Sequence, residues 1–360
     1  MGVGVAGKAG VESGSEAAAA TAAAVLTAPL SLEGGLAAEL RPANLVQRVL
    51  SLFRNVRPGS DLSHFQLPAT FNLPKSQLQL YGEGVYCVGK DYLRRCAKGS
   101  DAVERFAAVV GWSISTTRPP IFGFAPYNPI ELVWCQNPIP KFHGTSVEAT
   151  VKGMRHVKLL KFSENYEIDC PNLLIRLLPA PSAEWSGTVR IVCKESELEA
   201  ELIYYRSNAF LGLGGDPRCV KGKIFSSRSG EIICEIDGHW DRIVSAKDAK
   251  TGKVSVLYDA ESAIADLKTP VVRNQEGVSP SESVVVWGEV SDAILKKDWE
   301  RSSQAKRRVE DTARRLDRER NDKGEVWIPK HFSLSQDKNG SWECSPLEKS
   351  VPPAPIIVPS

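Results

Sequence analysis

The feature that most constrains the fold is a change of hydrophobic period near residue 131. From there to about residue 258, apolar residues alternate with polar ones, as in strands that bury one face. The clearest alternating positions are Val147, Ala149, Val151, Val189, Ile191, Leu198, Ala200 and Leu202, followed by runs at 220–225, 231–236 and 253–258. Turn signals separate these runs at Lys152-Gly153, 179–181, Gly214-Gly215, Ser229-Gly230 and Thr251-Gly252. Many short strands at this spacing predict an antiparallel sandwich or barrel.

Helical patterns flank the strands on both sides. Residues 44–56 place apolar side chains on one broad helical face, and 101–116 form a second helix with Ser100 or Asp101 as its cap. After residue 291, the stretch 292–320 has neither Pro nor Gly, and we expect Gly324 to end this long helix. Short helices, then many strands, then a long helix are typical of an α+β fold and argue against a βαβ alternation.

Composition excludes several classes of protein. The 360 residues include 45 Lys plus Arg and 43 Asp plus Glu, so the net charge of +2 gives no case for nucleic acid as the main partner. No run of about 18 apolar residues exists, so we expect no membrane span. The eight Cys have no CxxC spacing, which predicts reduced cysteines in the cytosol and no metal site. Residues 1–40 are rich in Ala and Gly and lack the features of a signal or transit peptide, which predicts a disordered tail.

The segment 238–242, Gly-His-Trp-Asp-Arg, is the densest polar and aromatic cluster. A hydrolase would pair His239 with Asp241, but the chain has no GxSxG motif and the segment directly follows an apolar strand. A structural role, with Trp240 packed among its neighbours, is therefore favoured. The glycines at 212–215 lack the remaining residues of a phosphate loop and predict a hairpin turn instead. We expect no catalysis, no cofactor and no metal.

The long helix carries Lys306, Glu310 and Arg314 at steps of four, which places them in one row. One interpretation is a pair of charge contacts on a solvated face. The other is a basic site for an anion, in which Glu310 holds one of the cations in place. A local excess of basic residues suits anionic headgroups and simple solubility equally.

Several segments resemble the plant type of the oxysterol-binding-protein-related family, in a short form without a pleckstrin homology domain. The matching segments, in chain order, are 65–68, 74–78, 105–110, 127–129, 221–225, 238–242, 286–290, 298–300, 327–332 and 344–346. In letters they include Phe-Gln-Leu-Pro, Arg-Phe-Ala-Ala-Val-Val, Tyr-Asn-Pro, Gly-His-Trp-Asp-Arg and Trp-Ile-Pro-Lys-His-Phe. So many matches in the same order extend the resemblance from about residue 45 to about residue 358.

The resemblance implies an incomplete antiparallel β-barrel around an apolar tunnel, with an N-terminal helical lid and a C-terminal helical segment. It divides the chain into a disordered tail (1–40), a lid and N-terminal helical region (41–130), the barrel region (131–290) and a C-terminal helix with an extended tail (291–360). The lid and tunnel residues that it implies are Leu45, Val49, Leu52, Phe53, Phe65, Leu67 and Phe71.

The same resemblance implies a protein that carries a sterol or phosphatidylinositol 4-phosphate between membranes without catalysing a reaction. We expect a cytoplasmic monomer that meets membrane surfaces transiently, for example at contacts of the endoplasmic reticulum. The headgroup residues implied are Lys306, Glu310 and Arg314 on the late helix, together with Asn128 and Pro129.

The chain departs from the family pattern at two of its phosphate ligands. The family has a Lys just before Asn-Pro, whereas residue 125 is Ala, and its His-His pair is absent. Asn128-Pro129-Ile130 is followed directly by residues 131–135, which resemble the sequence after the His-His signature. A segment is therefore missing, which predicts unpaired strand edges and weak or no phosphoinositide binding. The alternative function is a defective or regulatory isoform that contacts membranes or partners without carrying lipid.

Overall fold

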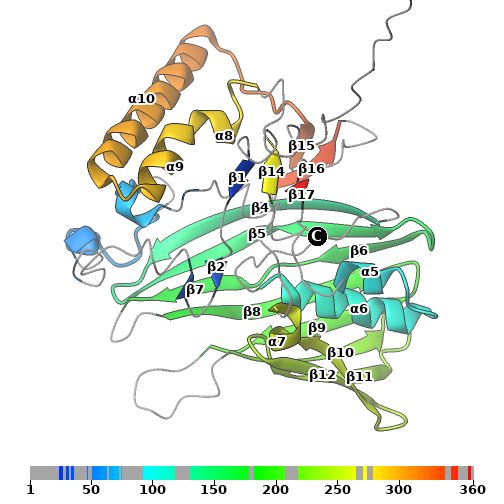
Figure 1. Ribbon diagram of the computed structural model, residues 1–360. Coiled ribbons are helices and arrows are strands. Elements are labelled where there is room, and N and C mark those ends of the chain that lie inside the picture. The colour runs from blue at the N-terminus through cyan, green and yellow to red at the C-terminus, as the bar shows by residue number, and fades with distance from the viewer. Residues whose placement is uncertain are drawn as a thin grey trace, which may run out of the picture.

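A ten-stranded antiparallel sheet forms the centre of the computed structural model (Figure 1). Its strands are β4 (Ile130–Phe142), β5 (Ser146–Leu159), β6 (Glu164–Ile168), β7 (Asn172–Arg176), β8 (Ser182–Cys193), β9 (Leu198–Tyr204), β10 (Cys219–Ser226), β11 (Ile232–His239), β12 (Ile243–Asp248) and β13 (Val254–Asp259). They follow the order β13-β12-β11-β10-β9-β8-β6-β5-β4, and β7 pairs with both β5 and β8. Among the described strands, β4 and β13 end this order and do not pair with each other. The sheet is therefore an open, incomplete barrel, and the predicted α+β class is confirmed.

The structure describes residues 24–26, 30–31, 34–35, 47, 51–62, 65–72, 74, 92–117, 130–177, 182–206, 218–264, 271–273, 279–336, 342–347 and 356–357. The helices are η1 (Ala69–Phe71), α5 (Tyr92–Cys96), α6 (Ala102–Ser115), α7 (Ala260–Ile264), α8 (Ser283–Val286), α9 (Gly288–Leu295) and α10 (Trp299–Lys323). The remaining strands are β1 (Ala24–Leu26), β2 (Leu30–Ser31), β3 (Gly34–Gly35), β14 (Val271–Arg273), β15 (Phe332–Gln336), β16 (Trp342–Pro346) and β17 (Ile356–Ile357).

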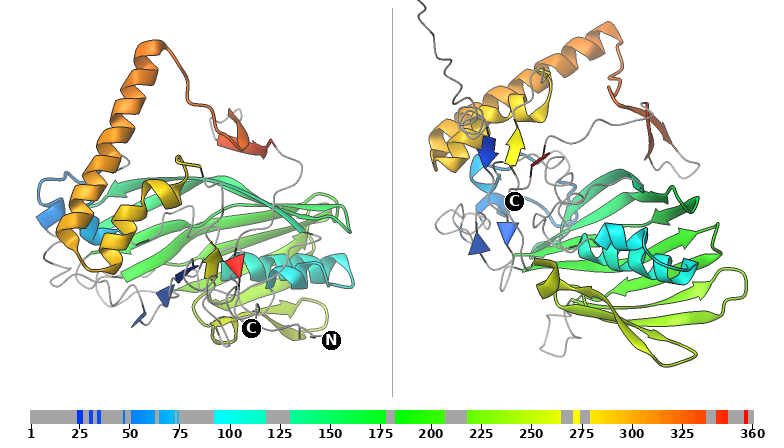
Figure 2. Two further views of the ribbon diagram at one scale, coloured as in Figure 1. Left: turned by 45° about the horizontal axis from the view of Figure 1, so that its top comes forward. Right: turned by 45° about the vertical axis from the view of Figure 1, so that its right-hand side comes forward.

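Helix α6 lies within the curve of the sheet (Figures 1 and 2). It begins as predicted, because the Asp101 carboxylate accepts a hydrogen bond from the Glu104 backbone N–H at 2.8 Å. The Glu104 carboxylate in turn accepts a hydrogen bond from the Ser100 backbone N–H at 2.9 Å, one residue before the donor that a capping box would use. The predicted apolar face is buried, with Phe106 and Ile114 fully inaccessible to solvent.

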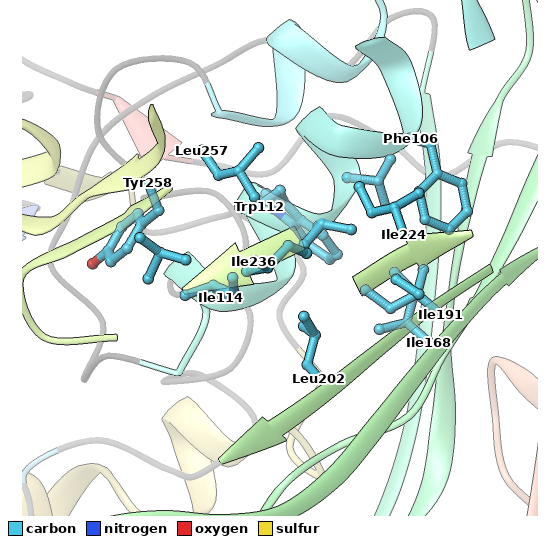
Figure 3. Packing of buried hydrophobic residues seen from close by; sticks show 14 of the residues in the cluster. Phe106, Trp112, Ile114, Ile168, Ile191, Leu202, Ile224, Ile236, Leu257 and Tyr258 are labelled. Atoms are coloured by element: carbon cyan, nitrogen blue, oxygen red, sulfur yellow. The ribbon is translucent and has the colours of Figure 1, made fainter. Parts of the chain in front are cut away.

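The main core lies between α6 and the concave face of the sheet (Figure 3). Trp112 and Phe106 from the helix meet Ile191, Leu202 and Ile224 from the strands, and all five side chains are completely buried. Burial alternates along β6 and β9 with the period of two that the sequence shows. At Leu198, Ala200 and Leu202 of β9 the alternating pattern therefore predicted correctly which side chains face inward.

Gly111 marks a close approach between α6 and β13. A Cβ atom built at this position would lie 2.5 Å from the Leu257 backbone oxygen. In an ordinary helix interior, Gly→Ala stabilises by about 1 kcal/mol. Here we expect Gly111→Ala to destabilise the protein by about 1–3 kcal/mol, because the helix must move off the strand. Urea unfolding checks the sign, and a stabilised variant would contradict the close packing.

The turn expected at Lys152-Gly153 is wrong. Lys152-Gly153 is not a turn but lies inside β5, opposite Asn137 and Gln136 of β4. Gly153 has a φ of 104°, a value that only glycine adopts readily, so the strand absorbs this residue without leaving the ladder. The local turn signal is therefore overridden by pairing with β4, which continues through Lys152 and Gly153.

The long helix is broken rather than continuous. α9 ends at Leu295, Lys297 adopts a left-handed φ of 57°, and the Asp298 N–H donates to the Ala293 oxygen at 2.9 Å. This is a helix-ending motif that normally uses glycine at the left-handed position. Asp298 then caps α10 through the Arg301 N–H at 3.0 Å, and Gly324 ends α10 as predicted. The break lets Val290 and Ile294 of α9 pack against Ala305 of α10, in a satellite core.

The two ends of the chain also differ from the sequence expectations. Within the first forty residues, expected to form a disordered tail, β1 pairs with β14 and β2 with β3. Ala24-Val25-Leu26 is a short apolar run that suits a strand. Near the other end, expected to be a helix and an extended tail, β15 and β16 form a hairpin. The predicted division into four regions is otherwise untested and stays a prediction.

Candidate functional site

Lys306 lies two turns into α10 and is buried, although it is a lysine. Its Nζ donates to the Leu67 backbone oxygen at 2.6 Å and to Asn72 Oδ1 at 2.7 Å. Burial lowers the pKa of the ammonium, and the nearby Glu310 carboxylate opposes this effect. The cation therefore binds two neutral oxygens on either side of η1 and ties this short helix to α10.

Glu310 and Arg314 continue the row predicted from the sequence. The Glu310 carboxylate lies 3.8 Å from Lys306 Nζ through one oxygen and 3.4 Å from Arg314 Nη2 through the other. Arg314 also contacts Asp311 at 2.7 Å, and its side chain is half-exposed. The row thus runs from a buried ammonium through a shared carboxylate to an exposed guanidinium, so an anion can reach Arg314 directly but can reach Lys306 only by displacing η1.

Segment 51–62, in the predicted lid region, covers one end of the large sheet. Phe53 stacks between Phe65 and Phe142, with ring centroids 5.5 and 4.7 Å apart. The Phe142 backbone N–H donates to the Ser60 oxygen at 3.1 Å, and the Gly59 N–H donates to the Phe142 oxygen at 2.6 Å. These bonds cover part of the free edge of β4, which would otherwise expose unpaired backbone groups.

The other predicted site residues are placed as follows. Leu52 is half-buried beside Phe53, and Leu67 is exposed even though its backbone oxygen binds Lys306. Phe71 closes η1, but its side chain lies outside the described residues. Leu45, Val49, Asn128 and Pro129 lie outside the described residues altogether. The structure thus places Leu67 beside α10 and Phe53 beside β4. The role of Asn128 and Pro129 in headgroup binding stays a prediction.

Two buried arginines were missed by the sequence analysis. Arg105 of α6 contacts Glu164 of β6 through both carboxylate oxygens, at 2.9 and 2.5 Å, and Tyr166 donates to Glu164 at 2.7 Å. Arg155 of β5 donates to Thr116 at 2.6 Å and to Ser113 at 2.9 Å. A usable signal existed for Arg155, because it shares its strand parity with the buried Val157 and Leu159. Both arginines fix α6 to the sheet.

The cluster 238–242 has the structural role that the sequence favoured. Trp240 is buried, and Arg218 lies over its ring at 5.8 Å. Arg218 also binds the Asp241 carboxylate at 2.8 Å. Gly238 leaves no room for a side chain, because a Cβ there would meet the Ile243 oxygen at 2.2 Å. These contacts engage Asp241 in an ion pair across the β10–β11 end of the sheet.

No group of three His, Cys, Asp or Glu side chains in the described part of the chain is placed to hold a metal ion. None of the described helices is long and apolar enough to cross a membrane.

Comparison with known proteins decides the family. The family model described as oxysterol-binding protein matches residues 118–293. Oxysterol-binding protein-related protein 4B of Arabidopsis thaliana is 46% identical, over 93% of this chain and 97% of its own length. The chain belongs to the oxysterol-binding protein family. Protein 4A of the same plant is 43% identical over 93% of this chain and 96% of its own length.

Solved structures of this family show the same fold at low identity. The Osh1 ORD domain in complex with cholesterol gives a TM-score of 0.62 at 16% identity, covering 90% of each chain. The Osh3 ORD of Saccharomyces cerevisiae in complex with PI(4)P gives 0.60 at 19% identity, covering 82% of this chain and 89% of its own. The antiparallel sheet with its internal helix is therefore the fold of an oxysterol-binding protein domain.

The alignment with the plant relative also bears on the missing segment. It extends over 374 positions, more than the 360 residues of this chain, although it covers only 93% of them. The relative therefore has a few dozen residues with no counterpart here. The resemblance around Asn128 likewise implies a missing segment of a few dozen residues.

Proposed function

We propose that this oxysterol-binding protein is a non-catalytic lipid carrier that takes up a sterol or phosphatidylinositol 4-phosphate and moves it between membranes. The observation that carries the proposal is the 46% identity to a curated oxysterol-binding relative over 93% of the chain. The fold it shares with domains solved with cholesterol and PI(4)P supports it. Physically, a lipid outside a bilayer exposes apolar surface at a cost of about 25 cal/mol per Å², and an enclosed apolar tunnel removes that cost.

The lid is the role that we propose for the N-terminal region. It would comprise Leu45, Val49, Leu52, Phe53, Phe65, Leu67 and Phe71. Two contacts support this assignment, the stacking of Phe53 on Phe65 and Phe142 and the hydrogen bond from Lys306 to Leu67. Backbone hydrogen bonds of Gly59, Ser60 and Leu62 to β4 also hold the segment, so opening of the lid would have to break them.

The headgroup site that we propose consists of Lys306, Glu310, Arg314, Asn128 and Pro129. The geometry of the row supports it. A phosphate bound at the exposed Arg314 would lie next to the Glu310 carboxylate, which is the partner of Lys306 on α10. We propose that a carrier of this kind works as a monomer in the cytoplasm and meets membranes transiently, for example at contacts of the endoplasmic reticulum.

Substitutions on α10 test the headgroup assignment. Lys306→Met and Arg314→Met should each weaken phosphatidylinositol 4-phosphate binding about tenfold, because each removes one charge-assisted contact, and should leave sterol binding within about twofold. Binding of both lipids is measured by extraction from vesicles. Arg315→Met is the matched control, since Arg315 is also exposed on α10 and pairs with Glu319 at 2.6 Å.

Asn72→Leu separates headgroup binding from support of the lid. It removes one oxygen partner of Lys306 and leaves the cation in place. If Lys306 only holds the lid, Asn72→Leu and Lys306→Met will weaken both lipids to the same degree, and that result would reject the headgroup role.

A regulatory isoform that carries no lipid is the second candidate function. The unmatched residues of the plant relative favour it, because a shorter wall encloses a lipid less well. Binding of the chain to anionic vesicles without measurable uptake of either lipid would establish it. Uptake of sterol alone would support the carrier function for that lipid.

A further inference from the structure

The connection between α10 and β15 presents an unusual apolar surface. Three consecutive side chains, Val326, Trp327 and Ile328, are 83%, 63% and 80% exposed. Figure 2 shows this connection at the end of α10 that lies away from the large sheet. The Leu347 N–H donates to the His331 oxygen at 3.0 Å, which brings the exposed Leu347 to the same place. We call residues 326–328 with Leu347 the apolar tip.

Nothing in the described core reaches the apolar tip. On α10 the buried side chains are Ser302, Ala305 and Lys306, all in its first turns, and the rest of the helix projects into solvent. β15 is exposed along its whole length, including Phe332 and Leu334. The tip thus stands at the far end of α10, where the chain turns back toward the β15–β16 hairpin, and β16 of this hairpin packs against β4 and β5.

The charges around the apolar tip have a small basic excess. Between residues 314 and 331 there are six Lys or Arg side chains and four Asp or Glu side chains. Asp317 pairs with Arg320 and Glu319 with Arg315, so Asp322 and Glu325 are the acids that remain near the tip. In the described part of the chain, Lys323 and Lys330, which flank the tip on its two sides, have no ion pair. Their side chains are long enough to reach past the tip toward an anionic surface.

We propose that the apolar tip inserts into the headgroup layer of an anionic membrane, with Lys323 and Lys330 binding lipid phosphates on either side. A tryptophan between two cations is the composition that favours this layer. The small area of the tip favours a fluid lipid surface over a protein, because four side chains cover far less than the roughly 800 Å² per partner of a stable protein interface. A fluid layer requires no matching groove, and shallow insertion of a few apolar side chains is sufficient for reversible binding.

Vesicle flotation of the full chain tests this proposal. Vesicles are made from phosphatidylcholine alone or with phosphatidylserine in a roughly four-to-one ratio, without sterol or phosphoinositide, so cargo uptake plays no part. We expect binding to the mixed vesicles only. Trp327→Ser with Ile328→Ser should weaken it about tenfold or more, and Lys323→Gln with Lys330→Gln should weaken it and reduce its salt dependence.

The chain offers a matched control for lost apolar surface. Val254 and Val256 on β13 are 61% and 56% exposed, in another part of the molecule, and replacing both by Ser should leave vesicle binding unchanged. Equal weakening by this pair, or unchanged binding of the Trp327 and Ile328 variant, would overturn the proposal.

Fluorescence locates the insertion directly. Lipids brominated in the upper acyl chain should quench part of the tryptophan emission of the wild type. Trp327→Leu should bind as well as the wild type but lose that quenched part, even though the chain has eight Trp. Unaltered quenching in Trp327→Leu would reject insertion at the tip. Concentration-dependent dimers that the Trp327→Ser, Ile328→Ser variant abolishes would also reject it, since they would show that a second copy of the chain covers the tip.

Discussion

Replacing Glu164 by Leu is expected to lower the free energy of unfolding by about 3–5 kcal/mol, one of the largest effects available in this chain. Arg105 and Glu164 are 8% and 6% exposed, and the two side chains share two hydrogen bonds. The Glu164 carboxylate raises the pKa of Arg105. Without it, the contacts left to Arg105 among the described residues are the Gly99 oxygen at 3.3 Å and the Phe162 ring at 3.9 Å, with Asp101 as a more distant charge. A buried guanidinium would then lack its counter-charge, and the free-energy cost of removing it from water would no longer be compensated.

A double-mutant cycle separates the loss of pairing from the loss of packing. Glu164→Leu with Arg105→Met removes both charges and should be less destabilising than the sum of the two single changes. Arg190 and Glu199 provide the control, since they make a 2.6 Å contact on the same sheet with Arg190 exposed. Arg190→Met should cost no more than about 1 kcal/mol. Chemical denaturation measures all four, and an additive cycle at Arg105 would contradict a specific ion pair.

Supplying the missing segment should have the largest effect on lipid binding. When the unmatched residues of the plant relative are inserted after Pro129, we expect extraction of phosphatidylinositol 4-phosphate to rise about a hundredfold. The family resemblance implies that this segment carries a His pair for phosphate, and two charge-assisted hydrogen bonds account for about 3 kcal/mol. Extraction from vesicles by the original and extended chains, side by side, measures the effect.

Two comparisons make the result specific. An extended chain in which both histidines of the insert are replaced by Ala restores the wall but not the donors, so sterol uptake should recover more than phosphoinositide uptake. Micromolar or tighter extraction of phosphatidylinositol 4-phosphate by the unextended chain would contradict the predicted defect outright.

The regular parts of the fold could be predicted from the sequence because their signals are local. Alternation at Leu198, Ala200 and Leu202 requires only neighbouring residues, and burial along β9 follows it. The cap at Asp101 and the stop at Gly324 are likewise specified within one turn of the helix. The row of Lys306, Glu310 and Arg314 follows from helical spacing alone and is confirmed as a row of contacts.

The remainder depends on contacts between distant residues. The burial of Lys306 follows from the oxygens of Leu67 and Asn72, which flank η1 more than two hundred positions earlier in the chain. The helix break at Lys297 lacks the glycine that normally announces it, and it follows from packing of Ile294 on Ala305. Gly153 carries a turn signal that strand pairing overrides. No local sequence pattern contains this information, so the burial of Lys306, the helix break and the course of β5 could not be predicted from the sequence.

The strand order also bears on how the chain reaches its folded state. From β8 to β13 each strand pairs with the one that precedes it in the sequence, so this meander can form through short loop closures. The bond between Lys306 and Leu67 closes a loop of 239 residues and must come late. Amide hydrogen exchange should therefore be slowest in β9 to β11 and fast in η1 and the far half of α10. The part of the molecule that we propose to open and to touch membranes would be the last to fold and the first to exchange.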